Sequence, residues 1–317
     1  MPVYLLKKTA SLIFTLALVA VITFFIFEIL PGDAALVRLG IDATHAQVEA
    51  YRAEMGLDQP VYIRLGEWFY KAFRGDFGVS TRFDQPVKLL IRSRMAVTTQ
   101  LTILALLMTI LIGIPISLLS AKYRGRMSGL ALGVVTQIGM AVPTFWLGIL
   151  ATYLFGLMLG WFTPGAYVSL SENFGRGLTY LLFPALALAI PRVAVLVRYT
   201  RSSILDEWGK EYVRTGYAKG LSTDWIMYRH VLRNSLIPTL TILGMMVAEI
   251  LGGTLIIEQI YNIPGMGKLL IAGISGRDFP LVQGMVLYIA FLVIVIHVFL
   301  DILYKLIDPR VNREEHL

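Results

Sequence analysis

Few side chains in this 317-residue sequence have the types and spacing that catalysis or metal binding requires. Cysteine is absent, which excludes disulfides, thiolate metal sites and a cysteine nucleophile. The four histidines form no zinc-protease pattern, and the apolar segments hold no serine-hydrolase elbow and no pair of aspartates. We therefore predict that the chain is not an enzyme and that it binds no metal and no cofactor.

One short segment superficially matches a nucleotide-binding loop. Gly267 precedes Lys268, as a glycine precedes the lysine of a P-loop. The first glycine of that motif would have to stand at position 262, which is asparagine, and Leu269 replaces its final serine or threonine. We predict that this segment binds no nucleotide.

Arg192 and Glu249 are lone charges inside two long apolar segments. A charged side chain at the centre of a membrane helix costs about 2.5–3.5 kcal/mol on insertion scales, so each should face protein or water. A rise of about 1.5 Å per residue in a core of about 30 Å places the two roughly 7 Å apart in depth. Three interpretations remain open. The two residues pair within the chain, Glu249 lines a solute pathway and attracts a cationic group, or Arg192 reaches the cytoplasmic headgroups.

The elements that must position these residues are long apolar helices. The composition is 56% hydrophobic and 15% charged, against about 45–50% and about 25% in soluble domains. An apolar run of about 20 residues is long enough for a helix to cross the bilayer core. Six runs reach this length: Thr9–Leu30, Ala96–Ala121, Met127–Ser171, Gly177–Val197, Asn234–Ile257 and Phe279–Leu300. We predict an all-α membrane protein with six transmembrane helices, the first retained as a helix and several kinked by internal prolines.

The distribution of Lys and Arg predicts the orientation of these helices. The flanks on one side carry 15 basic residues, seven of them in the segment 198–234, whereas the opposite short loops carry only Arg176, Lys268 and Arg277. Basic flanks stay in the cytoplasm, so both termini and the segment 198–234 are predicted to be cytoplasmic. The same distribution explains the net charge of +7 without a nucleic-acid partner.

The external loop, residues 31–95, is predicted to hold short helices. Thr44 and Gln47 form a capping box that opens a helix which Gly56 could end, and Pro60 suits the first turn of a second helix. Trp68 and Phe69 lie on the apolar side of that second helix. These two rings either dock a partner protein or simply cap the helix bundle.

The cytoplasmic segment 198–234 is too rich in apolar residues to be a disordered linker. Gly216 and Gly220 divide it, and Ser222, Thr223 or Asp224 can cap the helix that follows. An exposed apolar face in the cytoplasm predicts a short helix that sits in a groove of a partner. The alternative is an amphipathic helix that lies on the lipid surface.

This segment resembles the cytoplasmic loop of ABC-importer permeases of the dipeptide, oligopeptide, glutathione and nickel branch. The matching residues are Glu211–Ser222 and His230–Pro238, and further motifs follow in the family's order along the whole chain. They are Pro31–Asp33, Gly56–Asp58 with Pro60, Gly75–Gly78 with Ser80, Pro143–Trp146, Arg198–Ser203, Gly252–Gly253, Glu258, Pro264–Gly267, Asp278–Pro280, Gln283 and Asp308–Arg310. The sequence departs from the family at Arg214, where an acidic residue is usual, and at Ala34, where a proline is usual. The order is similar to that of the first permease of the pair, the dipeptide-permease-B-like one.

The resemblance implies a permease subunit of an importer in a bacterial cytoplasmic (inner) membrane. A second homologous permease would complete the pathway, two ABC ATPase subunits would hydrolyse ATP, and an extracytoplasmic substrate-binding protein would deliver the solute. The family's ATPase-coupling loop corresponds here to Glu211, Tyr217, Ala218, Lys219, Gly220 and Leu221. Di- or oligopeptides are the expected solute, with nickel, a metallophore or glutathione as alternatives. A stand-alone secondary transporter or channel is the alternative of a different class, with Arg192 and Glu249 as its midplane charges.

These predictions divide the chain into four parts. Residues 1–30 form the N-terminal segment and first transmembrane helix, and 31–95 the external subdomain. Residues 96–307 form the permease core with five further helices, and 308–317 a cytoplasmic tail.

Overall fold

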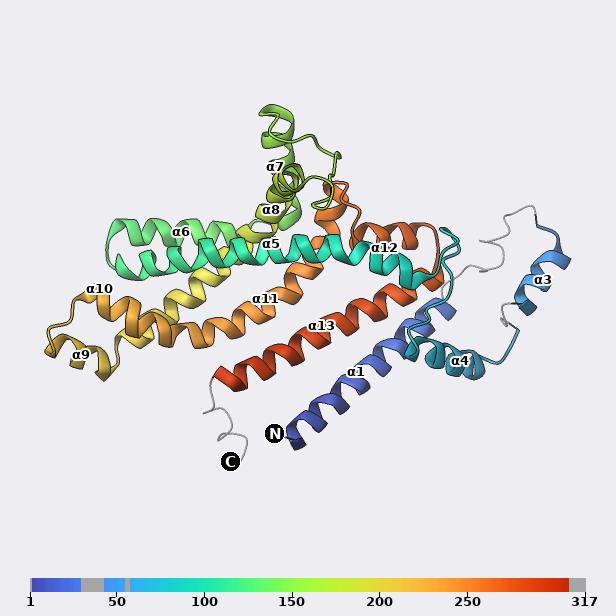
Figure 1. The fold of residues 1–317 in the computed structure, drawn as a ribbon, viewed down its shortest axis with the longest axis horizontal. Coiled ribbons are helices and arrows are strands. Elements are labelled where there is room, and N and C mark those ends of the chain that lie inside the picture. Colours follow the sequence, from blue (N-terminus) through green and yellow to red (C-terminus); the bar gives the residue numbers. More distant parts are fainter. Residues whose placement is uncertain (1, 30–42, 55–57, 308–317) are drawn as a thin grey trace. The chain divides into compact units, whose positions relative to one another are not determined.

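The computed structural model describes residues 2–29, 43–54 and 58–307 (Figure 1). The segment 31–34, the predicted helix end at Gly56 and the tail 308–317 lie outside these residues. Within the described part the chain is helical, and the only β-type contact there is an isolated bridge between Val79 and Pro86. The predicted all-α architecture is confirmed.

The helices and their bounds are as follows. They are α1 Pro2–Ile29, α3 His45–Glu54, α4 Val61–Phe73, α5 Val87–Lys122, α6 Met127–Ala141, α7 Thr144–Ala151, α8 Phe174–Trp208, α9 Glu211–Ala218, α10 Thr223–Ile226, α11 Leu232–Ile260, α12 Met266–Ser275 and α13 Phe279–Ile307. Two π-helical segments, η1 Thr152–Met158 and η2 Met227–Val231, extend α7 and join α10 to α11. Five segments of the described chain are long and apolar enough to cross a membrane: Lys8–Ile29, Val87–Lys122, Phe174–Trp208, Thr223–Ile260 and Phe279–Phe299.

The apolar run that begins at Met127 does not form one straight helix. α6 ends at Ala141, and the segment Thr144–Met158 leaves it at an angle of 97°. Val142 is extended, at φ −81° and ψ 124°, because the ring of Pro143 disfavours the helical conformation in the residue before it. The described chain therefore has six spans only if this bent pair counts as one.

The chain divides into two compact units. One comprises Met1–Ala96 and Gly265–Val295, and the other Val97–Pro264 and Ile296–Leu317. α5 and α13 each contribute to both units.

The first unit has an apolar core where α5 begins. Val87 and Ile91 of α5 pack there with Leu269 of α12 and with Leu281 and Met285 of α13. Gly284 permits this packing, since a Cβ atom there would lie 2.8 Å from side-chain carbons of both Phe77 and Val87. The core holds the segment 77–91 against the start of α13.

In the same unit, the predicted capping box opens α3. The Thr44 N–H donates to Gln47 Oε1 at 2.9 Å, and the Gln47 N–H donates to Thr44 Oγ1 at 3.4 Å. Pro60 takes the N-cap position of α4 directly before Val61, and the predicted turn at Gly75–Gly78 has positive φ at both glycines. The sequence-based prediction of two short helices followed by a turn is confirmed.

The second unit is built around α8. α6, α7 and α11 contact this helix, and its buried residues include the small side chains Ala185, Ala187 and Ala189. Small residues let membrane helices approach closely, which explains why α8 carries so many of them. α8 thereby holds Arg192 against α11 and leads into the segment that follows Trp208.

Candidate functional site

The candidate site is the loop that follows α8, here called the coupling segment, Gly209–Val231. α9 ends at Ala218 because Gly220 adopts φ +77°. The Gly220 N–H donates to the Tyr217 carbonyl at 2.9 Å and the Leu221 N–H to the Gly216 carbonyl at 3.1 Å. This is a Schellman motif, in which glycine at C′ reverses the chain without a Cβ clash.

A second cap positions the next turn of the coupling segment. The Ser222 side chain accepts a hydrogen bond from the Trp225 N–H at 3.3 Å, which confirms one of the three predicted caps. Lys122 at the end of α5 forms an ion pair with Asp224 at 2.6 Å. The reversal at Gly220 is therefore fixed by backbone hydrogen bonds on one side and by a side-chain cap with an ion pair on the other.

The coupling segment buries four of its apolar side chains against its own chain. Val213, Ile226, Met227 and Val231 form a core with residues of α5 and α8 that include Ile204. Gly216 sits over this core, since a Cβ atom there would meet Ile226 at 3.1 Å. The segment is thus a fixed shelf and not a loose linker.

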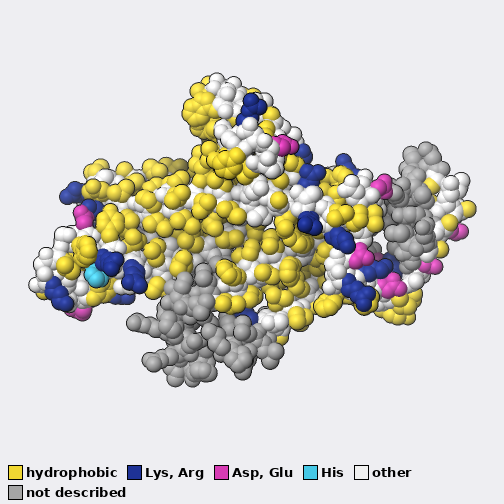
Figure 2. Space-filling model, in the orientation of Figure 1, with side chains coloured by type: hydrophobic (Ala, Val, Ile, Leu, Met, Phe, Trp, Pro, Cys, Tyr) yellow, Lys and Arg dark blue, Asp and Glu magenta, His cyan; other side chains and the backbone are white. Residues whose placement is uncertain are grey.

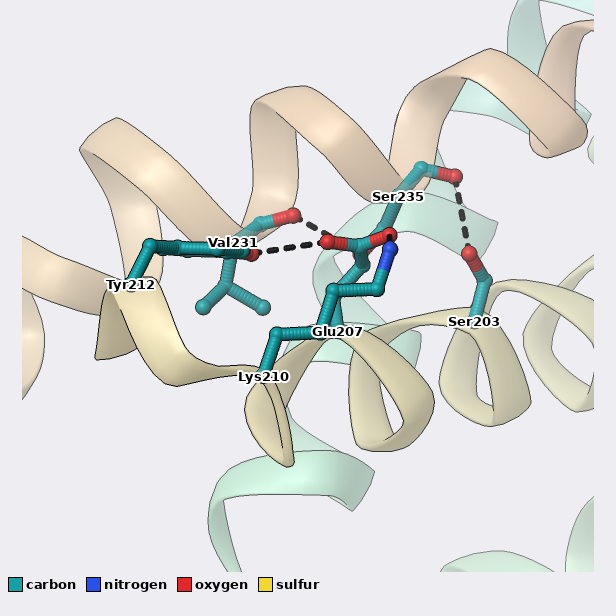
Figure 3. Close-up of polar contacts among 6 residues, drawn as sticks. All are labelled: Ser203, Glu207, Lys210, Tyr212, Val231 and Ser235. Carbon is teal, nitrogen blue, oxygen red and sulfur yellow. Dashed lines mark hydrogen bonds and ion pairs between the residues drawn. The ribbon is translucent and has the colours of Figure 1, made fainter. Parts of the chain in front are cut away.

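Polar contacts connect this shelf to α8 and α11 (Figure 3). The Tyr212 hydroxyl donates to Glu207 Oε2 at 2.8 Å, and Lys210 pairs with the same carboxylate. Burial is the main cause that raises the pKa of Tyr212 above its ordinary value, at which the hydroxyl is already protonated and able to donate at neutral pH. The Ser203 hydroxyl donates to the Ser235 carbonyl at 3.2 Å, which couples the end of α8 to α11.

The outward surface of the shelf carries aromatic and charged side chains. Tyr217, Trp225 and Tyr228 are 43%, 54% and 54% exposed. Ala218 and Lys219 are also exposed, and Leu221 is half-buried. Glu211 pairs with Arg214 at 3.0 Å on the surface, where an ion pair contributes little to stability. Figure 2 shows basic side chains gathered on the end of the second unit that holds α9 and α10.

The second predicted site brings Arg192 and Glu249 together. Arg192 Nε lies 3.2 Å from Glu249 Oε2, and Arg192 Nη2 lies 3.5 Å from the Glu249 backbone oxygen. The arginine side chain is 21% exposed and the glutamate 54% exposed. Half of the glutamate surface therefore remains open on the outside of this chain.

The predicted docking pair on α4 is partly turned inward. The Trp68 ring lies 5.9 Å from the Phe24 ring of α1, and Phe69 meets Trp68 edge-on at 5.8 Å. Both rings are half-buried, whereas Tyr62, Tyr70 and Phe73 are the exposed aromatic side chains of this helix. Trp68 thus connects α4 to α1, and Phe69 packs against Trp68.

The first unit contains a polar cluster whose residues were not predicted from the sequence to lie together. Asp278 is fully buried and accepts hydrogen bonds from the Ser80 hydroxyl, from the Thr81 and Arg82 N–H groups at 3.2 and 3.1 Å, and from the Leu281 N–H at 3.2 Å. The available signal was an aspartate before a helix-starting Phe-Pro pair. Nothing in the sequence tied it to a serine 198 residues away.

Comparison with known proteins gives a consistent result over the whole chain. Residues 113–313 match the family described as binding-protein-dependent transport system inner membrane component. Residues 1–102 match a second family, described as the N-terminal part of the binding-protein-dependent transport system membrane component. A putative peptide transport system permease protein of Brucella suis biovar 1 is 39% identical over 312 residues, which cover 98% of this chain and 99% of that protein.

Two further relatives have similar coverage. The oligopeptide transport system permease protein AppB of Bacillus subtilis is 34% identical over 98% of this chain and 100% of its own length. The glutathione transport system permease protein GsiC of Salmonella choleraesuis is 35% identical over 98% of each chain.

Among solved structures, the MetNI methionine ABC transporter in an inward facing conformation shares the fold. Its TM-score is 0.57 at 15% identity, over 69% of this chain and 97% of that one. The chain therefore belongs to the binding-protein-dependent transport system inner membrane components and is a multi-pass permease of an ABC importer.

Proposed function

We propose that this permease forms, with a second homologous permease, the pathway by which di- or oligopeptides enter a bacterial cell across its cytoplasmic membrane. The observation that carries the proposal is the match over 98% of the chain to relatives named as peptide and oligopeptide permeases. The chain has a large share of apolar helices, and its sequence shows none of the catalytic motifs considered above. Both observations agree with a permease that leaves ATP hydrolysis to partner ATPases.

The proposed topology has six spans, with the bent pair α6 and α7 as one of them and both termini in the cytoplasm. It is supported by the basic residues around Lys122 and in the coupling segment. Because the chain has no cysteine, a single cysteine can be introduced at Ser222 or at Ser171 without other changes. A membrane-impermeant maleimide should label Ser222→Cys only from the cytoplasm and Ser171→Cys only from outside, and the reverse would contradict this topology.

The coupling segment is proposed to seat in the ATPase subunits. Its exposed aromatic side chains, Tyr217, Trp225 and Tyr228, lie on a shelf that is fixed by its own core. A rigid projection transmits a displacement, whereas a loose loop absorbs it. Ala218, Lys219 and Gly220 are exposed at the reversal, where a groove of the partner can reach them.

Reconstitution tests the function directly. The complete complex in proteoliposomes should accumulate a labelled tripeptide only when ATP and the peptide-loaded binding protein are both present. Accumulation without ATP would instead support a secondary transporter. Failure to accumulate any di-, tri- or pentapeptide, with another solute transported, would overturn the peptide assignment.

Glutathione is the second candidate solute, because GsiC matches this chain as completely as the peptide permeases do. Glutathione is itself a tripeptide, so one pathway could serve both classes. Competition in the same assay distinguishes them. A hundredfold excess of glutathione should leave uptake of an unrelated tripeptide unchanged if the system is a general peptide importer, and should suppress it if glutathione is the preferred solute.

Trp68 and Phe69 are proposed to support the surface on which the binding protein docks. Replacing both with alanine should weaken the stimulation of ATP hydrolysis by the loaded binding protein, while basal hydrolysis persists. The effect is expected because Trp68 contacts Phe24 of α1 and Phe69 packs against Trp68, so that loss of both rings would release α4 and displace its outer face. The measurement is the concentration of binding protein that gives half-maximal stimulation.

The matched control for that variant is Tyr62→Ala with Phe73→Ala on the exposed side of α4. These rings have no part in holding α4, so a loss of stimulation here with normal yield locates the docking contact on the outer face. If Trp68→Ala with Phe69→Ala only lowers the yield of folded complex, the two rings are a cap and the docking proposal is wrong.

A further inference from the structure

All the exposed residues of α11 except Arg233, near its start, form one continuous stripe along the helix. They recur at every third or fourth position, which is the spacing of a single helix face. The members of this α11 stripe are Asn234, Pro238, Thr241, Met245, Glu249, Gly252, Ile256 and Gln259. The stripe runs nearly the full length of a helix that is apolar enough to cross a membrane.

The α11 stripe differs in chemistry from the outward stripe of α5. The exposed residues of α5 in the second unit include Ile103, Leu107, Leu111, Pro115 and Leu119, as expected of a surface against lipid. The α11 stripe instead offers an asparagine, a threonine, a glutamate and a glutamine. Polar and ionisable side chains of membrane helices face protein or water because exposure to lipid is costly. The α11 stripe therefore faces away from lipid.

Glu249 lies at the middle of this stripe. One side of its carboxylate contacts Arg192, and the other side is exposed. Arg192 approaches its carboxylate from the α8 side, at 3.2 Å, and offsets part of the cost of a charge at this depth. Gly252, one turn further, leaves space next to Glu249, since a Cβ atom there would meet nothing within 4 Å. The carboxylate can therefore accept a second cationic partner from outside the chain.

We propose that the α11 stripe is part of the pathway wall and that Glu249 is a subsite for the cationic group of the solute. The inference rests on the proposed function, since it takes the solute to be a peptide that crosses between two permeases. An ammonium group suits this subsite because its three N–H donors can share a carboxylate that already receives one guanidinium. Arg192 acts as a positioning residue that orients the carboxylate.

The test compares three peptides of equal length that carry a lysine, a glutamine or a glutamate at one position. Uptake by reconstituted complex is measured at saturating loaded binding protein, so that its own selectivity does not limit the rate. Glu249→Gln should lower uptake of the lysine peptide roughly two- to fivefold relative to the glutamate peptide, the range for a solvent-exposed ion pair. Glu249→Asp should restore part of the preference, because it keeps the charge.

Leu107→Ala on the outward stripe of α5 is the matched control, and it should leave the ratio between the peptides unchanged. An equal change for all three peptides, or no change, overturns the cationic subsite. A fall in thermal stability with the ratio preserved also overturns it, because the pair would then only stabilise the fold. If the wild type transports none of the three peptides, the failure lies in the peptide assignment on which the inference rests.

Discussion

Replacing Gly220 with aspartate should lower ATP-driven uptake by at least about tenfold, which corresponds to about 1.4 kcal/mol of docking free energy, while the protein still inserts in the membrane. Gly220 has φ +77°, and a Cβ atom there would meet nothing within 4 Å of its own chain. The side chain of the substituted residue therefore meets no neighbouring atom of its own chain, although the positive φ adds a backbone cost. The added carboxylate projects from the surface that we propose seats in the ATPase. The measurements are uptake and the amount of ATPase that copurifies with the permease.

Gly125 provides a closely matched control for this variant. It too has positive φ, +79°, with open space around its Cβ position, but it lies in the turn between α5 and α6. Gly125→Asp carries the same conformational cost and the same charge, so it should retain most of the uptake. Equal losses in both variants would mean that backbone strain or charge on this side explains the effect. Normal ATPase recruitment and normal transport by Gly220→Asp would contradict the coupling role outright.

Replacing Asp278 with alanine should destabilise the first unit by about 3–5 kcal/mol, because the buried donors around it lose their acceptor. Asp278 is fully buried and holds the Ser80 hydroxyl together with the N–H groups of Thr81 and Arg82. It also caps the start of α13 through the Leu281 N–H at 3.2 Å. The measurement is the midpoint of thermal unfolding of the detergent-solubilised complex, with the yield from membranes.

Asp76→Ala is the control for Asp278→Ala. Asp76 lies in the same segment and accepts one hydrogen bond, from the Gly78 N–H at 3.0 Å, but it is exposed to solvent. Water can replace the lost acceptor there, so the cost should stay near or below about 1 kcal/mol. Asp278→Asn keeps one oxygen acceptor and should fall between the two. A midpoint for Asp278→Ala equal to that of Asp76→Ala would show that the buried cluster does not hold the first unit together.

The coupling segment shows how far local patterns reach. Gly220 was predicted to divide the segment, and the structure has a Schellman motif there. Ser222 was one of three possible caps, and its hydroxyl accepts the capping hydrogen bond. These features could be predicted because they depend on conformational preferences within a few residues. The apolar residues of the segment were expected to face a partner, yet Val213, Ile226 and Val231 are buried within the chain. A pattern shows that a side chain needs cover but does not show which surface supplies it.

The sequence by itself determined the class of protein, the apolar segments, the caps of α3 and α4 and the family. These follow from composition, from runs of apolar residues and from motifs in a fixed order, all of which are local or additive. Only the tertiary structure decided that Arg192 contacts Glu249, that Ser80 meets Asp278 across 198 residues, and that the polar residues of α11 line up on its exposed face. Each of these depends on how helices far apart in sequence pack, and side-chain volumes across the whole unit set that packing.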